Sequence, residues 1–84
     1  MTIEEYCSVI NVELVCTMLK PGVWHAKAKS VEVMDRGALR SEFGAGETPE
    51  KALRDYAKQI AGRRIAINAM SSTRREFDVP ENVQ

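Results

Sequence analysis

The side chains best suited to chemistry in this chain are few and are separated along the sequence. His25 is the only histidine, and Cys7 and Cys16 are the only cysteines. A lone imidazole lacks the further ligands that a zinc site requires, and two thiols do not make a disulfide framework. We therefore expect reduced, half-buried thiols and no metal site, cofactor or catalytic residue, so the sequence predicts a protein that is not an enzyme.

A glycine-rich segment at residues 44–48, Gly-Ala-Gly-Glu-Thr, precedes the strongest helix signal. The backbone N–H groups at a helix N-terminus can hold an anion. The segment lacks the lysine of a phosphate-binding loop, however, and Glu47 would repel phosphate. We interpret it as a turn followed by a helix cap, which is the ordinary role of such residues.

Basic residues gather near the C-terminus and on one predicted strand. Those that could share a surface are Lys27, Lys29, Arg63, Arg64, Arg74 and Arg75. They are the candidate nucleic-acid-binding residues, because neutralising phosphates supplies much of the affinity of such proteins. The twelve basic side chains are balanced by twelve acidic ones, which favours a solvated surface of mixed charge over a nucleic-acid site.

Length and composition limit what can position these residues. The chain has 84 residues, 44% of them apolar and 29% charged, as is typical of one globular domain. We expect a single domain over 1–84, with its core in about 10–69 and a tail, 70–84, that is extended or partly ordered. No segment has the ~20 consecutive apolar residues of a membrane span, and the acidic start does not resemble a signal peptide. We therefore expect a cytoplasmic protein that does not enter a membrane.

Alternating apolar and polar residues predict three strands before the helix. Residues 10–19 alternate in this way and end at a Lys-Pro-Gly turn, 20–22. The second strand follows, and its apolar phase shifts at Ser30, where we predict a β-bulge. A turn at 35–37 leads to the third strand, 39–43, which the glycine-rich segment ends.

One amphipathic helix from Pro49 to Ile60 is the clearest element in the sequence. Thr48 is a good N-cap, Pro49 suits the first helical position, and Gly62 suits the residue just beyond the end. The apolar stripe consists of Ala52, Leu53, Tyr56, Ala57 and Ile60. A final short strand at 65–69 is close enough in sequence to reach an edge of the sheet.

The two ends of the chain are each open to two interpretations. Thr2 followed by Glu5 fits a capping box, so either a helical turn or an irregular lead-in is expected there. In the tail, Phe77 and Val79 alternate with acidic residues. This spacing is typical of an edge strand, or of an extended segment that docks on a partner.

Together these elements predict an α+β fold in which a three-stranded antiparallel meander carries one packed helix and a short final strand, in the order β-β-β-α-β. The segment from Phe43 to Leu53 resembles the matching stretch of HicB-type antitoxins. The residues at comparable positions are Phe43, Gly46, Glu47, Thr48, Ala52 and Leu53. In that family the N-terminal domain has a truncated ribonuclease-H-like fold with the same element order, and it neutralises a small toxin ribonuclease by binding it. The chain also resembles small accessory proteins of bacteriophages in its size and its C-terminal sequence.

The resemblance implies a fold and not an activity. The chain lacks the Leu-Pro-Gly stretch that is usual before the third strand, and the C-terminal DNA-binding segment of such antitoxins. A ribonuclease-H-like enzyme needs several carboxylates that converge on divalent metal ions. On that fold Glu13 and Asp55 would stand on the first strand and the helix, but Asn68 stands on the last strand. We expect both acids to be solvated.

The glycine-rich segment is also similar to the one before a helix in double-stranded-RNA-binding domains. In that family, lysines at the start of the helix grip phosphate. Here Pro49, Glu50 and Lys51 stand at those positions, so an acid stands where cations are needed. A nucleic-acid-binding domain is therefore the alternative to a protein-binding one.

Apolar residues on the outer side of the predicted sheet carry the functional expectation. One helix covers one sheet face, and Val15 and Leu19 fall on the face opposite Leu14 and Met18. The candidate protein-interface residues are Val15, Leu19, Trp24, Phe77 and Val79. We expect a non-enzymatic binding protein that inhibits or sequesters a macromolecular partner, a protein before a nucleic acid, and that forms a homodimer through this face or an edge strand. A second alternative is an oligomer that binds a small nucleotide-like ligand.

Overall fold

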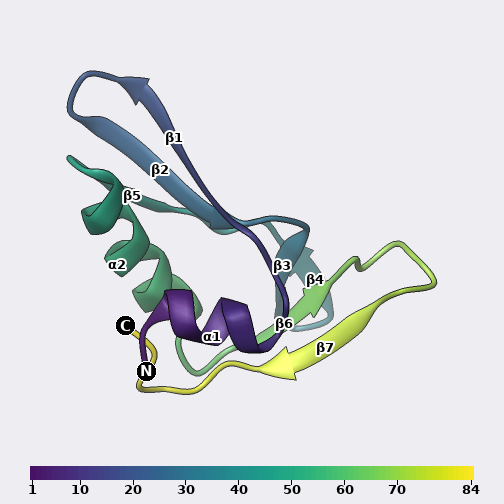
Figure 1. The fold of residues 1–84 in the computed structure, drawn as a ribbon. Coiled ribbons are helices and arrows are strands. Elements are labelled where there is room, and N and C mark those ends of the chain that lie inside the picture. The colour runs from purple at the N-terminus through teal and green to yellow at the C-terminus, as the bar shows by residue number, and fades with distance from the viewer.

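The computed structural model describes residues 1–84 and contains two helices and seven strands (Figure 1). The helices are α1 (Ile3–Val9) and α2 (Pro49–Ile60). The strands are β1 (Leu14–Lys20), β2 (Val23–Ala28), β3 (Val31–Asp35), β4 (Ala38–Arg40), β5 (Gly44–Gly46), β6 (Arg64–Ile67) and β7 (Arg75–Asp78). They form two antiparallel sheets with the orders β1-β2-β5 and β4-β3-β6-β7, so the α+β class with a helix packed on strands is confirmed. Neither helix has the length and apolarity of a membrane span.

The first sheet is built on the β1–β2 hairpin, which rises to the upper left in Figure 1. Pro21 and Gly22 form its turn, as predicted, and Gly22 has a φ of 79°, a left-handed conformation that glycine adopts without strain. A register shift between Met18 and Lys20 makes a bulge next to the turn. β5 pairs with the other side of β2 and completes the sheet.

The second sheet begins with the β3–β4 hairpin and continues through β6 to β7. Arg36 and Gly37, with φ values of 51° and 82°, make the tight turn that two-residue hairpins prefer. β6 pairs with β3, so the strand expected at 65–69 does join a sheet, over Arg64–Ile67. β7 adds to β6, which makes the segment around Phe77 an edge strand.

The single meander expected from the sequence is wrong in one respect, because its strands are divided between two sheets. β2 does not pair with β3, and its second partner is β5. Between β2 and β3, Ser30 has a left-handed φ of 62° and turns the chain from the first sheet into the second. The apolar phase shift at Ser30 is therefore a change of sheet and not a bulge. The third strand expected at 39–43 is also shorter than predicted, since it ends with β4 at Arg40 and residues 41–43 belong to no strand.

The glycine-rich segment forms β5 instead of ending a strand, because its glycines let the backbone approach α2 closely. A Cβ atom on Gly44 would lie 2.1 Å from the Ala52 carbonyl oxygen, and one on Gly46 would lie 2.6 Å from the Ala52 nitrogen. Ala45 lies between them and so faces away from the helix. Its N–H donates to the Asp55 carboxylate at 2.8 Å, which ties the open edge of β5 to α2.

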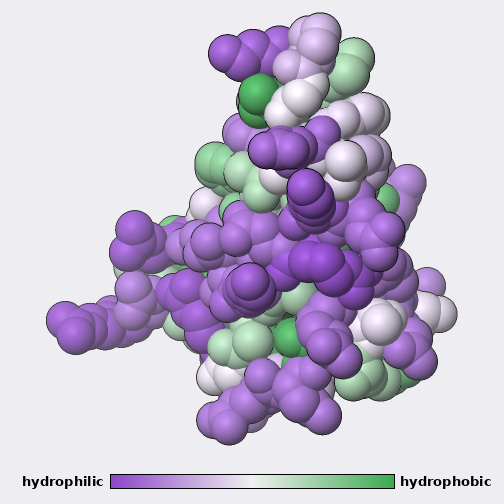
Figure 2. All heavy atoms as spheres, turned by 90° about the vertical axis from the view of Figure 1, so that its left-hand side faces the viewer, coloured by the Kyte–Doolittle hydropathy of each residue, from purple (hydrophilic) through white to green (hydrophobic).

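Local signals set the limits of α2 as predicted. The Thr48 hydroxyl accepts a hydrogen bond from the Lys51 N–H at 3.1 Å, and Pro49 takes the first helical position. Gly62 lies just past the end of the helix with a φ of 71°. The buried side of the helix consists of Ala52, Tyr56, Ala57 and Ile60. Figure 2 faces the side of the molecule that carries α2, and its middle and lower parts are mostly hydrophilic.

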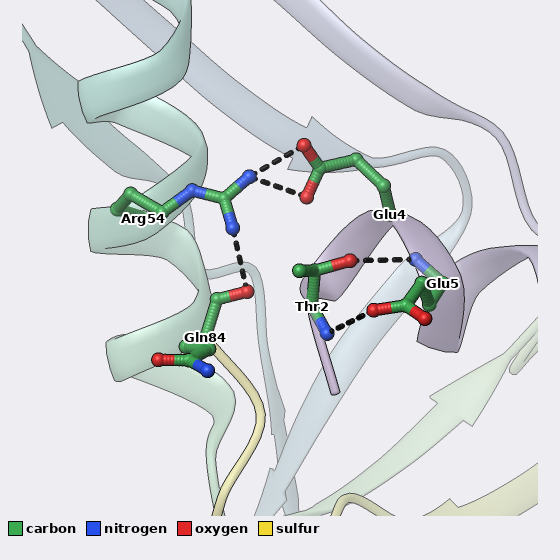
Figure 3. A network of polar contacts seen from close by, with 5 residues as sticks. All are labelled: Thr2, Glu4, Glu5, Arg54 and Gln84. Atoms are coloured by element: carbon green, nitrogen blue, oxygen red, sulfur yellow. Dashed lines mark hydrogen bonds and ion pairs between the residues drawn. The ribbon is translucent and has the colours of Figure 1, made fainter.

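The two ends of the chain meet beside α2 (Figure 3). Thr2 and Glu5 form the capping box, so the helical interpretation of the N-terminus is the one that the structure shows. Arg54 of α2 donates to both carboxylate oxygens of Glu4 and, at 2.8 Å, to the backbone oxygen of Gln84. This fork links α1, α2 and the C-terminal segment.

The core consequently extends beyond the expected range 10–69 at both ends. The additional core residues are Ile3, Tyr6 and Cys7 of α1 with Val79 and Val83 of the C-terminal segment. They pack into one cluster with buried side chains of α2, β2, β3 and β6. Figure 1 shows α1 beside α2 and the second sheet, where it contributes to this shared core.

Candidate functional site

The first sheet has one face packed on α2 and one face that is open. Residues paired across a hairpin share a face, and here Val15 pairs with Lys27 while Thr17 pairs with His25. Side chains alternate along β2, so Ala26, between these two residues, points the other way and is buried in the core. The four paired side chains therefore lie together on the open face.

A groove of about 510 Å³ lies on this open face, and we call it the β1–β2 groove. Its main lining side chains are Val15, Thr17, Leu19, His25, Lys27 and Phe43. It extends to the corner between the two sheets, where Lys29 and Ser30 also line it. A hollow of this volume is in the range that holds a small ligand or several side chains of a partner.

Three large apolar side chains of the groove are exposed to solvent. Val15 is 41% exposed, Leu19 56% and Phe43 49%. Neutral and hydrophobic atoms also gather at the top of Figure 2, the height at which Figure 1 places the tip of the β1–β2 hairpin. Grouped apolar side chains on a surface mark interaction sites, whereas single scattered ones are ordinary.

Phe43 is held in the groove by His25. Their rings are stacked, with centroids 4.3 Å apart and planes inclined by 28°. Phe43 lies in the segment before β5, and the pairing of His25 with Ala45 brings this segment beside β2. Sequence reasoning missed this pair, because it depends on β5 joining β2. Its only signal is the alternation that places His25 and Lys27 on one face.

The charged side chains that line the groove are basic. Lys27 Nζ donates to the Val31 carbonyl oxygen at 2.9 Å, which holds this lysine near the corner between the sheets. Lys29 is exposed at the same corner, and no acidic side chain lines the groove. The groove therefore offers two ammonium groups next to apolar walls.

The five predicted interface residues do not form one surface. Val15 and Leu19 lie in the groove, but Trp24 lies on the helix-facing side of β2 and packs against the core. Phe77 is half-buried on β7, in the other sheet. Val79 is only 3% exposed, so its assignment to an interface is wrong and it is a core residue. The apolar alternation of the tail reflects packing inside the chain.

Two arginines of the predicted nucleic-acid site are paired with acids across β6 and β7. Arg64 lies 3.0 Å from Asp78 and 3.2 Å from Glu76, and Arg74 lies 3.0 Å from Glu76. The hydrogen bonds that Arg64 donates to the carboxylates of Asp78 and Glu76 raise the pKa of Arg64. In turn, hydrogen bonds from Arg64 and Arg74 lower the pKa of Glu76. These guanidinium groups are balanced within the chain.

The other two arginines are also engaged. Arg63 lies 3.9 Å from the Glu42 carboxylate, and Arg75 donates to the Ile10 carbonyl oxygen at 2.8 Å. The six predicted basic residues are therefore not brought together. Only the two lysines lie at the β1–β2 groove, while the arginines lie on or next to β6 and β7.

The thiols and one of the acids considered for chemistry take part in the packing and hydrogen bonding of the fold. Burial raises the pKa of the Cys7 thiol to about 11, so it is protonated at neutral pH, and burial also raises the pKa of Cys16. Asp55, one of the acids considered for metal-dependent hydrolysis, accepts the backbone hydrogen bond from β5. No group of three or more His, Cys, Asp or Glu side chains is arranged to hold a metal ion.

Comparisons with families of known proteins, with curated proteins and with solved structures find no match to this chain. The resemblances to HicB-type antitoxins and to phage accessory proteins therefore gain no support from a related protein and stay predictions. Any function has to be argued from the β1–β2 groove itself.

Proposed function

We propose that this chain is a non-enzymatic binding protein that docks a partner protein in the β1–β2 groove. The proposal is carried by the exposure of Val15, Leu19 and Phe43 on a sheet face that α2 does not cover. Covering such side chains contributes roughly 25 cal/mol for each Å² of apolar surface removed from water. A partner held in this way is inhibited or sequestered without any catalysis, which is the mode of action that the HicB resemblance implies.

The lining of the groove favours an apolar and acidic segment of the partner. Its aliphatic and aromatic walls suit apolar side chains, while Lys27 and Lys29 attract carboxylates. Complementary charge at the rim of an apolar contact speeds association and rejects segments of the wrong sign. A segment in which apolar residues stand next to Asp or Glu satisfies both requirements.

A nucleic acid is the weaker candidate for this groove. Affinity for nucleic acids increases with the number of phosphates that the protein neutralises. The groove supplies two lysines, and the four predicted arginines are engaged elsewhere. The stacked rings of His25 and Phe43 could hold a base, so nucleic-acid binding is an outcome that the experiment has to distinguish.

Selection from a phage-displayed library of random peptides tests the proposal without a known partner. We expect the enriched peptides to combine apolar with acidic residues. Lys29→Glu places an acid at the groove and should weaken an enriched peptide about tenfold or more, which is ~1.4 kcal/mol. Lys58→Glu makes the same change of charge on the exposed side of α2 and should leave the affinity unchanged. Fluorescence anisotropy measures both affinities.

Three outcomes would contradict docking of a protein segment in the groove. Equal losses in Lys29→Glu and Lys58→Glu would show that charge alone attracts the peptide. Tighter binding of a single-stranded oligonucleotide than of any enriched peptide, with a steep dependence on salt, would make nucleic acid the partner. A free nucleotide that raises the midpoint of thermal unfolding more than the enriched peptides do would favour the small-ligand alternative.

A further inference from the structure

The outer edges of the two sheets differ in how they are protected. A free strand edge presents unpaired N–H and C=O groups, and natural proteins shorten, charge or cover such edges. β4 and β5 have three residues each, and the Asp55 carboxylate covers the Ala45 N–H of β5. β7 has four residues, three of them charged. β1 is different, because it has seven residues and no charged side chain from Leu14 to Leu19.

Every second residue of β1 turns its backbone polar groups toward the open edge. The Lys29 N–H donates to the Glu13 carbonyl oxygen at 2.8 Å, so the backbone polar groups of Glu13 point toward β2. Along an antiparallel strand these groups point alternately to one side and to the other. Val15 and Thr17 therefore also direct their backbone groups toward β2. The residues whose groups point away from β2 are Leu14, Cys16 and Met18. β1 is the last strand of its sheet, so these groups have no sheet partner.

We propose that β1 pairs in antiparallel orientation with β1 of a second copy of this chain. Glu13 precedes the uncharged run and Lys20 ends it, so an antiparallel copy places the acidic end of one strand beside the basic end of the other. A parallel copy would place like charges side by side. The formal net charge of 0 adds no overall repulsion between copies.

The side chains of β1 also favour a second copy. Met18 and Leu19 are 53% and 56% exposed, and they lie on opposite faces of the strand, so a strand added in the plane of the sheet contacts both. A foreign segment would have to supply apolar residues on both of its faces. β1 itself has them, which makes the edge complementary to its own copy.

One register satisfies the backbone and the side chains together. With Thr17 opposite Thr17 of the partner subunit, the outward-facing groups of Cys16 meet those of the partner's Met18. Val15 then packs beside the partner's Leu19 on the open face. The two-fold axis is then perpendicular to the sheet and passes between the two Thr17 residues. The two three-stranded sheets join into one, and both β1–β2 grooves open on the same side of it.

The pairing does not depend on what the groove binds. It uses the backbone of β1 and a lateral contact between Val15 and the partner's Leu19, whose upper surfaces stay open to the groove. Lys29 and Phe43 lie at the groove and away from the β1 edge. The dimer presents two grooves on one surface, and a partner with two matching segments would gain avidity from both. A failure of peptide binding would leave the dimer intact, and a failure of dimerisation would leave each groove complete.

Blocking the open edge tests the pairing. Met18→Pro removes one outward-facing N–H and spares the bonds to β2, because proline is tolerated in an edge strand when its missing N–H would face solvent. Met18→Ala removes the exposed side chain and keeps the N–H. In sedimentation velocity over a dilution series, we expect dimers for the wild type, weaker dimers for Met18→Ala and monomers for Met18→Pro. Lys58→Glu, on the exposed side of α2, should sediment like the wild type.

A wild-type chain that stays monomeric at the highest attainable concentration would overturn the proposal. A Met18→Pro chain that dimerises as strongly as the wild type would overturn it too. Circular dichroism of each variant shows whether the fold is retained. If Met18→Pro does not fold, a cross-linking measurement decides between dimer and monomer.

Cross-linking is read out in a Cys16→Ala background, where the remaining Cys7 is buried and its thiol is protonated. Thr17→Cys places a thiol opposite its own copy in a non-hydrogen-bonded pair, where Cα atoms are about 4.5 Å apart. With oxidised glutathione as the oxidant, we expect it to form a disulfide-linked dimer. The thiol of Val15→Cys faces Leu19 of the partner subunit, so this variant should form much less of the disulfide-linked dimer. No cross-link at Thr17, or equal cross-linking at both positions, would contradict the proposed pairing.

Discussion

The outer surface of the second sheet and the open face of the first sheet differ in how their exposed side chains are used. On the second sheet, Arg64 and Arg74 are paired with acids of β7, and the edge strand itself is charged. On the first sheet, Phe43 and Leu19 are exposed and Lys29 stands beside them without an acid in the groove. The arginines of the second sheet are paired with acids of the same chain, whereas apolar and cationic groups of the first sheet stay exposed to solvent. This difference is the reason why we propose the first sheet as the binding surface.

The largest expected effect separates the packed face of the first sheet from its open face. Gly44→Ala places a Cβ within 2.1 Å of the Ala52 carbonyl oxygen, so β5 and α2 must move apart, and we expect a loss of about 3 kcal/mol in the free energy of unfolding. Phe43→Ala, one residue earlier, removes a larger side chain from the open face and should cost about 0.5 kcal/mol or less. Urea unfolding followed by circular dichroism measures both. Equal losses in the two variants would show that the open face stabilises the fold as much as the packed face does, which would contradict the difference between the two faces.

An intermediate effect is expected where the chain ends meet α2. Arg54→Met removes the fork to Glu4 and Gln84 but keeps an apolar stem, so the free energy of unfolding should fall by roughly 1–2 kcal/mol. Lys58→Met, on the exposed side of the same helix, is the matched control and should change it by less than about 0.5 kcal/mol. Urea unfolding again measures the difference. Equal stability of the two variants would show that the chain ends are not clamped to α2.

The smallest effect concerns the acid dependence of the ion pairs on the second sheet. Hydrogen bonds from Arg64 and Arg74 hold the pKa of Glu76 below its ordinary value of 4.5 in the folded chain. The ionised carboxylate therefore stabilises the fold above pH 4.5, and this contribution is lost as the pH falls through the lowered pKa. Glu76→Gln removes this titrating group, so the melting temperature should fall less steeply below pH 4.5 than it does in the wild type. Thermal unfolding followed by circular dichroism at a series of pH values measures it.

The matched control for this acid profile lies on the first sheet. Lys29→Gln removes a charge that forms no ion pair with its cross-strand neighbour Glu13, so it should change the pH dependence of the melting temperature less than Glu76→Gln does. Parallel profiles for the wild type and Glu76→Gln would contradict the assignment. They would mean that the ion pairs of Glu76 on the second sheet do not stabilise the fold, and the contrast with the open face of the first sheet would be lost.

Features that depend on neighbouring residues could be predicted from the sequence. Thr48 and Pro49 begin α2 and Gly62 follows its end, because caps are made by residues next to the helix. The turn at Pro21 and Gly22 follows from the φ that each residue prefers. Alternation along β1 was also sufficient to place Val15 and Leu19 on the face away from the helix.

Features that depend on distant contacts could not be predicted in the same way. The left-handed conformation of Ser30 is uncommon for a residue other than glycine, and only the division into two sheets distinguishes it from a bulge. Gly44 and Gly46 are typical turn residues until α2 lies against them. The stack of His25 on Phe43 exists only because β5 joins β2. Each of these features follows from packing between segments that are separated in the sequence.

The claim that the open face of the first sheet is the binding surface is tested most directly by nuclear magnetic resonance. An isotope-labelled chain would be titrated with a peptide enriched in the phage selection, and the backbone amide shifts would be followed. We predict that the changes are concentrated in β1, in β2 and around Phe43, while the exposed side of α2 and β7 are unaffected. Changes centred on β7 or on the adjoining residues 68–74, with β1 and β2 unaffected, would contradict this claim.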